Sequence, residues 1–569
     1  MRVRILGSIQ VVMPDGSVVD PGSPTQRRLL AALALTPRRP VRAETLAETA
    51  GLTMGALRVS ISRLRRLLGP DTIATAPTGY RLEVDTDAEL TVAALRDANG
   101  HLPSLDAALA GWLGRALLRA GDADALPTLV EAAQLARRHG AKDTLVQAAL
   151  STRRGFVRVG DFAPTQRRLV EEALAVVSAD DIVARAQLLA MLGAALTGSP
   201  DSARREAAAT EALALADESD DPQLIARLAP DILCALWTPI TAELRAEISN
   251  RAVNAAIASG DPYLRFVVDV TAFNTAVSLG DAARAAVALA AMRQVVESHS
   301  EPRMRWSLSV VETFVATMAG RFEEAQRLAD ASVELGMSLG EPDAFSVFAS
   351  QFFVIGTFAG RYAQILPVVD QVLAGGEAAM PVRLAHAIAC AVSGRRDEAT
   401  AVLEAGQASG FAGATQDLFW LTTIVGYAVL SIELDDRAAA LELLPLLEPY
   451  ASQVAFNGAT SQGPVAAYLG RLASMLDRFD EADRHLRVAL ATTEAFGWEY
   501  HRASTLVCLA EARLRRTGAP DGEATALLDE AQRICDDLGI GWWADRITTL
   551  RHAAPARGGG PTEGPHAVS

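Results

Sequence analysis

The sequence predicts a mainly α-helical protein that begins with a short α+β domain. Half of its 569 residues are hydrophobic and only 5% are aromatic, which is typical of packed small-residue helices and not of a β-sandwich or barrel. Breaks centred on glycine recur about every 40 residues through most of the chain, which indicates an array of helix pairs. Residues 1–86 instead combine strand, turn and helix signals, which indicates a separate domain.

The charge is distributed unevenly along the chain. The net charge is −15, although residues 1–85 hold 12 arginines and 7 acidic residues. This surplus of +5 leaves −20 for the remaining residues. A basic N-terminus on an acidic body predicts that any contact with nucleic acid is confined to the N-terminal domain.

Cysteine usage and hydropathy favour a cytoplasmic protein. The four cysteines have no CxxC spacing and lie in apolar helical stretches, so we expect reduced core residues. No apolar run is long and uncharged enough to cross a membrane, and the first residues are no signal peptide. Residues 551–569 are rich in glycine and proline and are predicted to form a disordered tail.

The N-terminal domain is predicted to hold a small sheet, three helices and a β-hairpin, in that order. Ser23 and Gln26 are spaced for a capping box around Pro24, which marks the start of the first helix. This order of elements is that of a winged helix-turn-helix, in which the third helix is the recognition helix. The predicted elements are strands over 2–7, 8–13 and 17–19, helices over 23–35, 43–50 and 53–68, and a hairpin over 71–84.

The third helix has two contrasting faces. At helical spacing, Ile61 shares one stripe with Met54, Leu57, Leu64 and Leu68, and this stripe is predicted to be buried. The opposite face carries arginines and small polar groups without a carboxylate, as a helix in the DNA major groove would. A solvated arginine-rich helix is the alternative, although solvated faces usually mix both charge signs. The element order and the local positive charge favour the DNA interpretation.

The same residues resemble a known family. Four segments carry the resemblance: LGSIQVV, QRRLLAALAL, VSISRLRRLLG and TGYRLEVD. They are similar to the OmpR-type DNA-binding domain of antibiotic-regulatory (SARP-type) bacterial transcription factors, and the similarity covers residues 1–86. The resemblance implies that the third helix reads bases in the major groove of direct repeats in promoter DNA, while the hairpin wing touches the minor groove. Many related wings carry an arginine just before the turn, where this chain has Ala76. In relatives, the link between the second and third helices often contacts RNA polymerase. This link is short here, which weighs against activation of transcription through such a contact.

The resemblance assigns roles to individual side chains by their position. Arg63 is the expected base reader. The residues expected beside it at the bases are Val59, Ser60 and Arg66. The residues expected at phosphates and sugars are Arg58, Ser62, Arg65, Thr78 and Arg81. Since one such domain carries little charge, we expect tight binding to need two copies on tandem half-sites, as in a homodimer on DNA.

Residues 108–550 are predicted to form one repeat array, after a polar linker over 87–107. Two of the breaks, at residues 320–325 and 477–482, have nearly the same sequence. In each, a residue suited to a left-handed cap is followed by an aromatic residue, two acids at the positive helix N-terminus, and an alanine. This pattern resembles the tetratricopeptide repeat (TPR), lengthened from about 34 to about 40 residues, in a superhelix with a concave face. The breaks lie at Gly121, Gly160, Gly198, Thr238, Gly280, Gly320, Gly360, Gly394, Asp435, Asp477 and Gly518.

The repeat region is also similar to the C-terminal repeats of large bacterial regulators, which carry an ATPase module before them. The one lysine of the chain, Lys142, does not lie in a GxxxxGK[ST] phosphate loop, so no ATPase is expected. His386 and Cys390 are spaced to offer two metal ligands on one helix face, but no further ligand is evident, and core packing is the better interpretation. With no GxSxG or HExxH motif, we expect no catalytic residue, no metal and no cofactor.

These observations lead to one main hypothesis. The protein is a sequence-specific transcription regulator of bacterial promoter DNA, and its repeat region senses or recruits a protein or small-molecule partner. The alternative is a TPR-like interaction scaffold in which the winged helix serves docking rather than DNA binding. An enzyme with a site inside the superhelix is a third interpretation, which no motif supports.

Overall fold

The computed structural model describes residues 2–86, 125–153, 164–374, 380–411 and 416–552, apart from short gaps within these ranges. The predicted linker, the first breaks at Gly121 and Gly160, and the predicted tail after residue 552 lie outside the described residues. In the described ranges, no helix combines the length and the apolar character needed to span a membrane.

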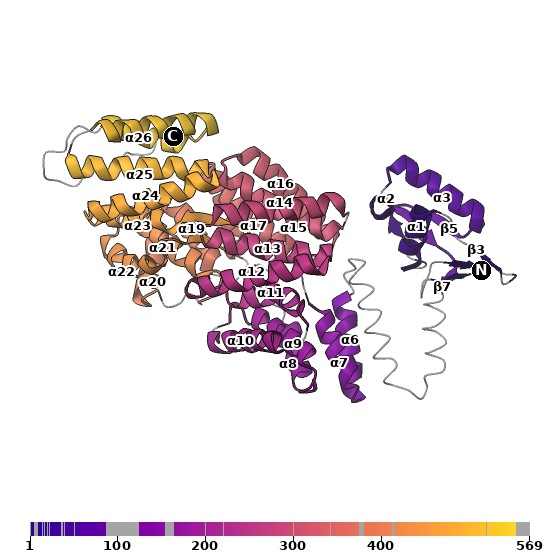
Figure 1. The fold of residues 1–569 in the computed structure, drawn as a ribbon. Helices are drawn as coiled ribbons and strands as arrows, with labels where there is room; N and C mark the ends of the chain where they lie inside the picture. Colours follow the sequence, from indigo (N-terminus) through magenta and orange to yellow (C-terminus); the bar gives the residue numbers. More distant parts are fainter. Residues whose placement is uncertain are drawn as a thin grey trace.

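The N-terminal domain contains the predicted sheet, three helices and hairpin in the predicted order (Figure 1). Two short strands were not predicted: β4 pairs antiparallel with β6 of the hairpin, and β7 pairs parallel with β1. The strands form two sheets, with the orders β3-β2-β1-β7 and β4-β6-β5. The elements are β1 (Arg2–Arg4), β2 (Gln10–Val12), β3 (Val18–Val19), α1 (Pro24–Leu35), β4 (Val41–Arg42), α2 (Ala43–Ala50), α3 (Met54–Leu68), β5 (Ile73–Ala76), β6 (Gly79–Leu82) and β7 (Asp85–Thr86).

Local sequence signals explain where these helices begin. The Ser23 amide donates to Gln26 Oε1 at 2.9 Å, and the Gln26 amide donates to Ser23 Oγ at 3.3 Å. The predicted capping box is therefore confirmed. Thr53 Oγ1 caps α3 by accepting from the Ala56 amide at 3.3 Å. These side chains satisfy amide groups that the first helical turn leaves without a partner.

The apolar stripe of α3 packs into the core of the N-terminal domain. Leu57, Ile61, Leu64 and Leu68 are buried, as predicted. The prediction for Met54 is wrong, because its side chain is 38% exposed. Side chains on a helix lean back toward its N-terminus. Met54 is the first residue of α3, so its side chain leans beyond the end of the helix and remains partly exposed.

The described residues from Ala125 to His552 form a TPR-like α-solenoid, in which consecutive helices pack against each other. The helices are α6 (Ala125–Arg138), α7 (Lys142–Ser151), α8 (Pro164–Leu174), α9 (Ile182–Ala195), α10 (Ser202–Glu218), α11 (Leu224–Ala235), α12 (Ala242–Ser259), α13 (Pro262–Ser278), α14 (Ala282–Ser298), α15 (Pro302–Met318), α16 (Phe322–Ser338), α17 (Ala344–Phe358), α18 (Tyr362–Ala374), α19 (Met380–Val392), α20 (Arg396–Ala408), α21 (Trp420–Leu434), α22 (Arg437–Leu447), α23 (Val465–Met475), α24 (Phe479–Phe496), α25 (Glu499–Thr517), α26 (Gly522–Leu538) and α27 (Gly541–His552).

The described breaks have the predicted left-handed backbone conformation, except the break at Thr238, where φ is −130° and Thr238 instead caps a short 3-10 helix. Gly320 has φ 79° and Gly394 has φ 86°, which L-residues with a side chain rarely adopt. Asp435 and Asp477 take the same left-handed conformation at φ 55° and 60°, which aspartate tolerates better than most residues. The alanine after the two acids is fully buried in the repeat that begins after Gly320, as predicted for close helix contact.

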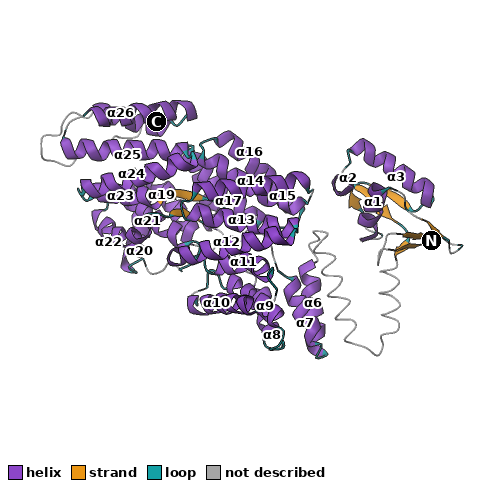
Figure 2. Ribbon diagram, in the orientation of Figure 1, coloured by secondary structure: helices purple, strands orange, loops and turns teal. Residues whose placement is uncertain are grey.

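A β-hairpin interrupts the helices, where only helices were predicted. It consists of β8 (Val454–Phe456) and β9 (Ser461–Pro464), after the 3-10 helix Glu448–Tyr450. Figure 2 shows its strands among the helices of the array. Gln453 Nε2 donates to the Pro239 carbonyl oxygen at 2.8 Å. The Asn457-Gly458 pair was the sequence signal for this turn.

The hairpin belongs to a core shared by two distant parts of the array. The ring of Phe456 lies 4.9 Å from Phe314 and 5.9 Å from Trp237, between ring centroids. Phe358 of α17 stacks on Tyr500 of α25 at 4.3 Å. Helices α13 to α17 and α24 to α27 therefore contribute to one hydrophobic cluster.

Candidate nucleic-acid interface

The outer face of α3 presents the side chains that the sequence placed at DNA. Arg58, Ser62, Arg63 and Arg66 are exposed, and Val59 is 51% exposed. Ser60 is half-buried at the edge of this face. Since α3 contains no acidic residue, the face carries positive charge beside small polar and apolar side chains, without a carboxylate.

Three of these arginines are available for an external partner. Among the residues that the structure describes, the guanidinium groups of Arg58, Arg63 and Arg66 have no ion pair and no hydrogen bond. Arginine side chains on a protein surface commonly pair with a nearby carboxylate, and many such pairs occur in the repeat array, for example Arg185 with Glu211 at 2.6 Å. The outer face of α3 is thus an unneutralised cationic surface.

Arg65 differs from its neighbours, because it is bound to the hairpin. Its Nε donates to the Ile73 carbonyl oxygen at 2.7 Å, and its Nη2 donates to Thr75 Oγ1 at 2.8 Å. Its guanidinium carbon lies 5.7 Å from the centroid of the Tyr80 ring, within the range of a cation–π contact. The structure thus places Arg65 between α3 and both strands of the hairpin.

The hairpin itself presents no unpaired cation between Ile73 and Leu82. Arg81 Nη2 lies 2.5 Å from Glu83 Oε1, and the residue before the turn is Ala76. Thr78 is exposed in the turn, and its carbonyl oxygen accepts from the Ala43 amide at 3.1 Å. Glu83 directly follows β6 and is two residues after Arg81, so the alternation of an extended chain could have predicted from the sequence that the two side chains share a face.

Glycine at position 79 sets the hairpin close to β4. A Cβ atom on Gly79 would lie 1.9 Å from the Val41 carbonyl oxygen, well inside the sum of the van der Waals radii. Only glycine therefore allows β4 to pair beside the hairpin, and this pairing fixes the hairpin relative to α1 and α2.

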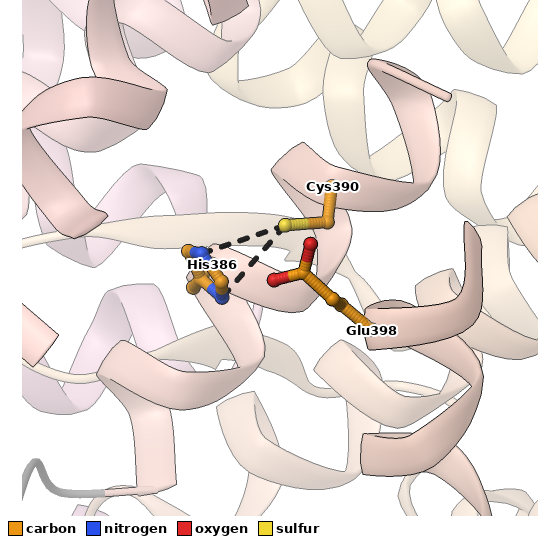
Figure 3. A group of neighbouring side chains, drawn as sticks. All are labelled: His386, Cys390 and Glu398. Atoms are coloured by element: carbon orange, nitrogen blue, oxygen red, sulfur yellow. Dashed lines mark hydrogen bonds between the residues drawn. The ribbon is translucent and has the colours of Figure 1, made fainter. Parts of the chain in front are cut away.

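A second group of polar side chains lies in the repeat array. Cys390 Sγ is 3.5 Å from His386 Nε2, and Glu398 of α20 lies beside them, as Figure 3 shows. The sequence paired His386 with Cys390 but missed two further partners. Asp370 Oδ1 lies 2.7 Å from His386 Nε2, and Arg395 donates to Glu398 Oε1 at 2.6 Å.

The contacts of this group favour a structural role. Arg395 also donates to Asp370 Oδ2 at 2.9 Å, so one guanidinium forms ion pairs with both carboxylates. It holds the pKa of Asp370 and of Glu398 below the usual range, with His386 assisting at Asp370. Burial raises the pKa of the Cys390 thiol, whereas a metal ligand must be a thiolate. A cation would have to displace Arg395, so we propose no metal here.

Comparisons with known proteins add little to this description. No family model matches the chain, and no curated protein matches it. Among solved structures, it is similar to a Signal Transduction ATPase with Numerous Domains (STAND) protein with a tetratricopeptide repeat sensor from Pyrococcus horikoshii, at 10% identity and a TM-score of 0.23, over 93% of this chain and 65% of that chain.

A second similar structure is a circular tandem repeat protein with novel repeat topology and enhanced subunit contact surfaces. The identity is 14% and the TM-score 0.11, over 92% of this chain and 95% of that chain. This chain spans 65% of the length of the archaeal protein. Matches this loose say nothing of what the chain binds, and the functional argument rests on the side chains described above.

Proposed function

We propose that the protein is a transcription regulator of the SARP type, which binds promoter DNA through α3 of a winged helix-turn-helix. The observation that carries this proposal is the outer face of α3, which has no carboxylate and holds three arginines without a partner in the described part of the chain. Arginine forms bidentate hydrogen bonds with guanine, and an apolar side chain such as Val59 can contact a thymine methyl group. Arg63 and Val59 lie one helical turn apart, so both would reach base edges.

The repeat array would then be the regulatory part of the molecule. TPR-like arrays offer extended surfaces for protein partners, and the net charge of −20 after residue 85 disfavours contact between the array and DNA. We assign the array the role of sensing or recruiting a protein or small molecule. We assign it no catalytic residue and no cofactor, so the protein would act in the cytoplasm by binding alone.

The experiment is a selection of bound sequences from a random pool of double-stranded DNA, using the full-length chain. We expect enrichment of a motif in direct repeats, bound as a homodimer, with affinity at least a hundredfold above that for random DNA in physiological salt. A pool that shows no enrichment, together with equal affinity for every sequence, would contradict the proposal. RNA polymerase is a proposed secondary partner, and its binding is tested by adding it to the complex of the protein with the selected DNA.

An interaction scaffold is the second candidate, in which the N-terminal domain docks a protein. The hairpin without an unpaired cation favours it, and so do the exposed apolar side chains Met54, Val59 and Leu67 on α3. In that case, changing Arg58, Arg63 and Arg66 together to alanine would leave the function of the protein in its host intact.

A further inference from the structure

The strongest unassigned feature of the N-terminal domain is the set of contacts made by Arg65. We infer that Arg65 is a positioning residue, which fixes the hairpin wing relative to the recognition helix, and that it does not neutralise a DNA phosphate. This inference rests on the proposed function, and it replaces the role at the DNA backbone that position alone suggested for this residue.

The geometry of the contacts carries the inference. The guanidinium of Arg65 uses two different nitrogens, one for the Ile73 carbonyl oxygen and one for Thr75 Oγ1. Both acceptors lie on β5, whereas Tyr80 beneath the guanidinium lies on β6. One side chain from α3 therefore holds both strands of the wing. A planar guanidinium can do this, because its donors point in fixed directions, and the ammonium group of lysine cannot.

Exposure separates Arg65 from its neighbours in the same helix. Arg65 is half-buried, whereas Arg63 and Arg66 are exposed and have no side-chain partner in the described structure. To reach a phosphate, Arg65 would have to release both hydrogen bonds to β5. Arg66 reaches outward without any such loss, and here we assign it to a phosphate in place of the base edge that position suggested. It follows Arg65 directly in the chain, so it is the matched control.

The role of Arg65 determines which part of the interface contributes positive charge. Arg81 is paired with Glu83, and Arg65 is bound inside the domain. Within α3 and the hairpin, the cations that face outward without a partner among the described residues are then all on α3. The wing would approach DNA with Thr78 and backbone groups, at a distance and angle that Arg65 sets. Its contribution is therefore geometric, whereas the contribution of α3 is both electrostatic and sequence-specific.

The test compares lysine and alanine at positions 65 and 66 in the full-length chain, on the DNA motif selected with the unaltered protein. Lysine keeps the charge of arginine but loses the fork of donors. We expect Arg66→Lys to bind nearly as well as the unaltered protein and Arg66→Ala to bind more weakly. Arg65→Lys and Arg65→Ala should instead be equally impaired, by about tenfold or more.

The salt dependence of binding supplies a readout that a loss of folding does not mimic. Each phosphate contact contributes about 0.9 to the slope of log affinity against log salt concentration. Arg66→Ala should reduce the slope by about that amount, whereas Arg65→Ala should leave it unchanged. Thr75→Val, which removes only the hydroxyl acceptor, should reproduce part of the binding defect of Arg65→Lys. The variant that combines Thr75→Val with Arg65→Lys should bind no more weakly than Arg65→Lys alone.

Two results would overturn the inference. One is recovery of binding by Arg65→Lys, and the other is a fall of about 0.9 in the salt slope for Arg65→Ala. Either would make Arg65 a phosphate ligand. Failure of the proposed function is a different result, because the unaltered protein would then select no motif in the first place.

Discussion

At the scale of single residues, Arg63 is the side chain whose role the proposed function defines most sharply. We expect Arg63→Ala to weaken binding to the selected motif by about 1–3 kcal/mol, because a bidentate contact with a base is lost. Binding to random DNA should change little. Competition titrations with motif and random DNA measure both. An equal loss on the two DNAs would assign Arg63 to the backbone instead of a base.

The candidate interface could be predicted from the sequence in part only. The burial of Leu57, Ile61, Leu64 and Leu68 follows from helical periodicity alone, and so does the outward face that carries Arg63. The partners of Arg65 could not be predicted in this way. They lie 8 and 10 residues away across a turn, so the contact depends on the angle at which the hairpin folds back onto α3.

At the scale of secondary-structure elements, the β8–β9 hairpin is the feature that the repeat pattern concealed. Its turn signal is local, but the strands are stabilised by contacts with residues far away in the sequence. Gln351 Nε2 donates to the Ala459 carbonyl oxygen at 3.3 Å, across 108 residues. Local patterns do predict the helix caps and breaks, because their hydrogen bonds join residues within about four positions. Contacts between distant segments leave no such pattern.

The hairpin is expected to stabilise the array through Phe456. This side chain is 2% exposed and packs between Trp237 and Phe314. We expect Phe456→Ala to lower the free energy of unfolding by about 3–5 kcal/mol, since it leaves a cavity in a dense core. Thermal unfolding followed by circular dichroism measures the change.

A matched control for Phe456 is available on a neighbouring helix. Val488 of α24 is 42% exposed, and Val488→Ala should change the free energy of unfolding by less than about 0.5 kcal/mol. If both variants shift the transition equally, the hairpin is not part of the cooperative core.

At the scale of the whole molecule, the shared core predicts a dependence of stability on pH. His501 lies within it, with its ring against Phe358 at 5.0 Å between centroids. Burial lowers the pKa of His501 from 6.5 to about 3. Between these pH values the unfolded chain binds a proton that the folded chain does not. The contribution of His501 to the free energy of unfolding is therefore fully present above pH 6.5. It falls as the pH drops, by at most about 1.4 kcal/mol per pH unit.

The variant His501→Phe isolates this contribution. A phenyl ring has a similar shape and no titrating group, so the fall in unfolding free energy between pH 6.5 and 4 should become shallower. Exposed His139 provides the control, and His139→Gln should leave the profile unchanged. Denaturant titrations at a series of pH values measure both. Parallel profiles for His501→Phe and the unaltered protein would mean that His501 is accessible to protons in the folded state.

The shared core also bears on how the repeat array can change in evolution. In an open solenoid each repeat contacts only its neighbours, so repeats can be duplicated or deleted with little effect elsewhere. In this chain, Gln453 is bonded to Pro239 across 214 residues, and Phe358 stacks on Tyr500. Removing or adding one repeat between these partners would bring the wrong helices together. The number of repeats between residues 239 and 453 is thus a fixed property of the protein, as strand number is in a closed barrel.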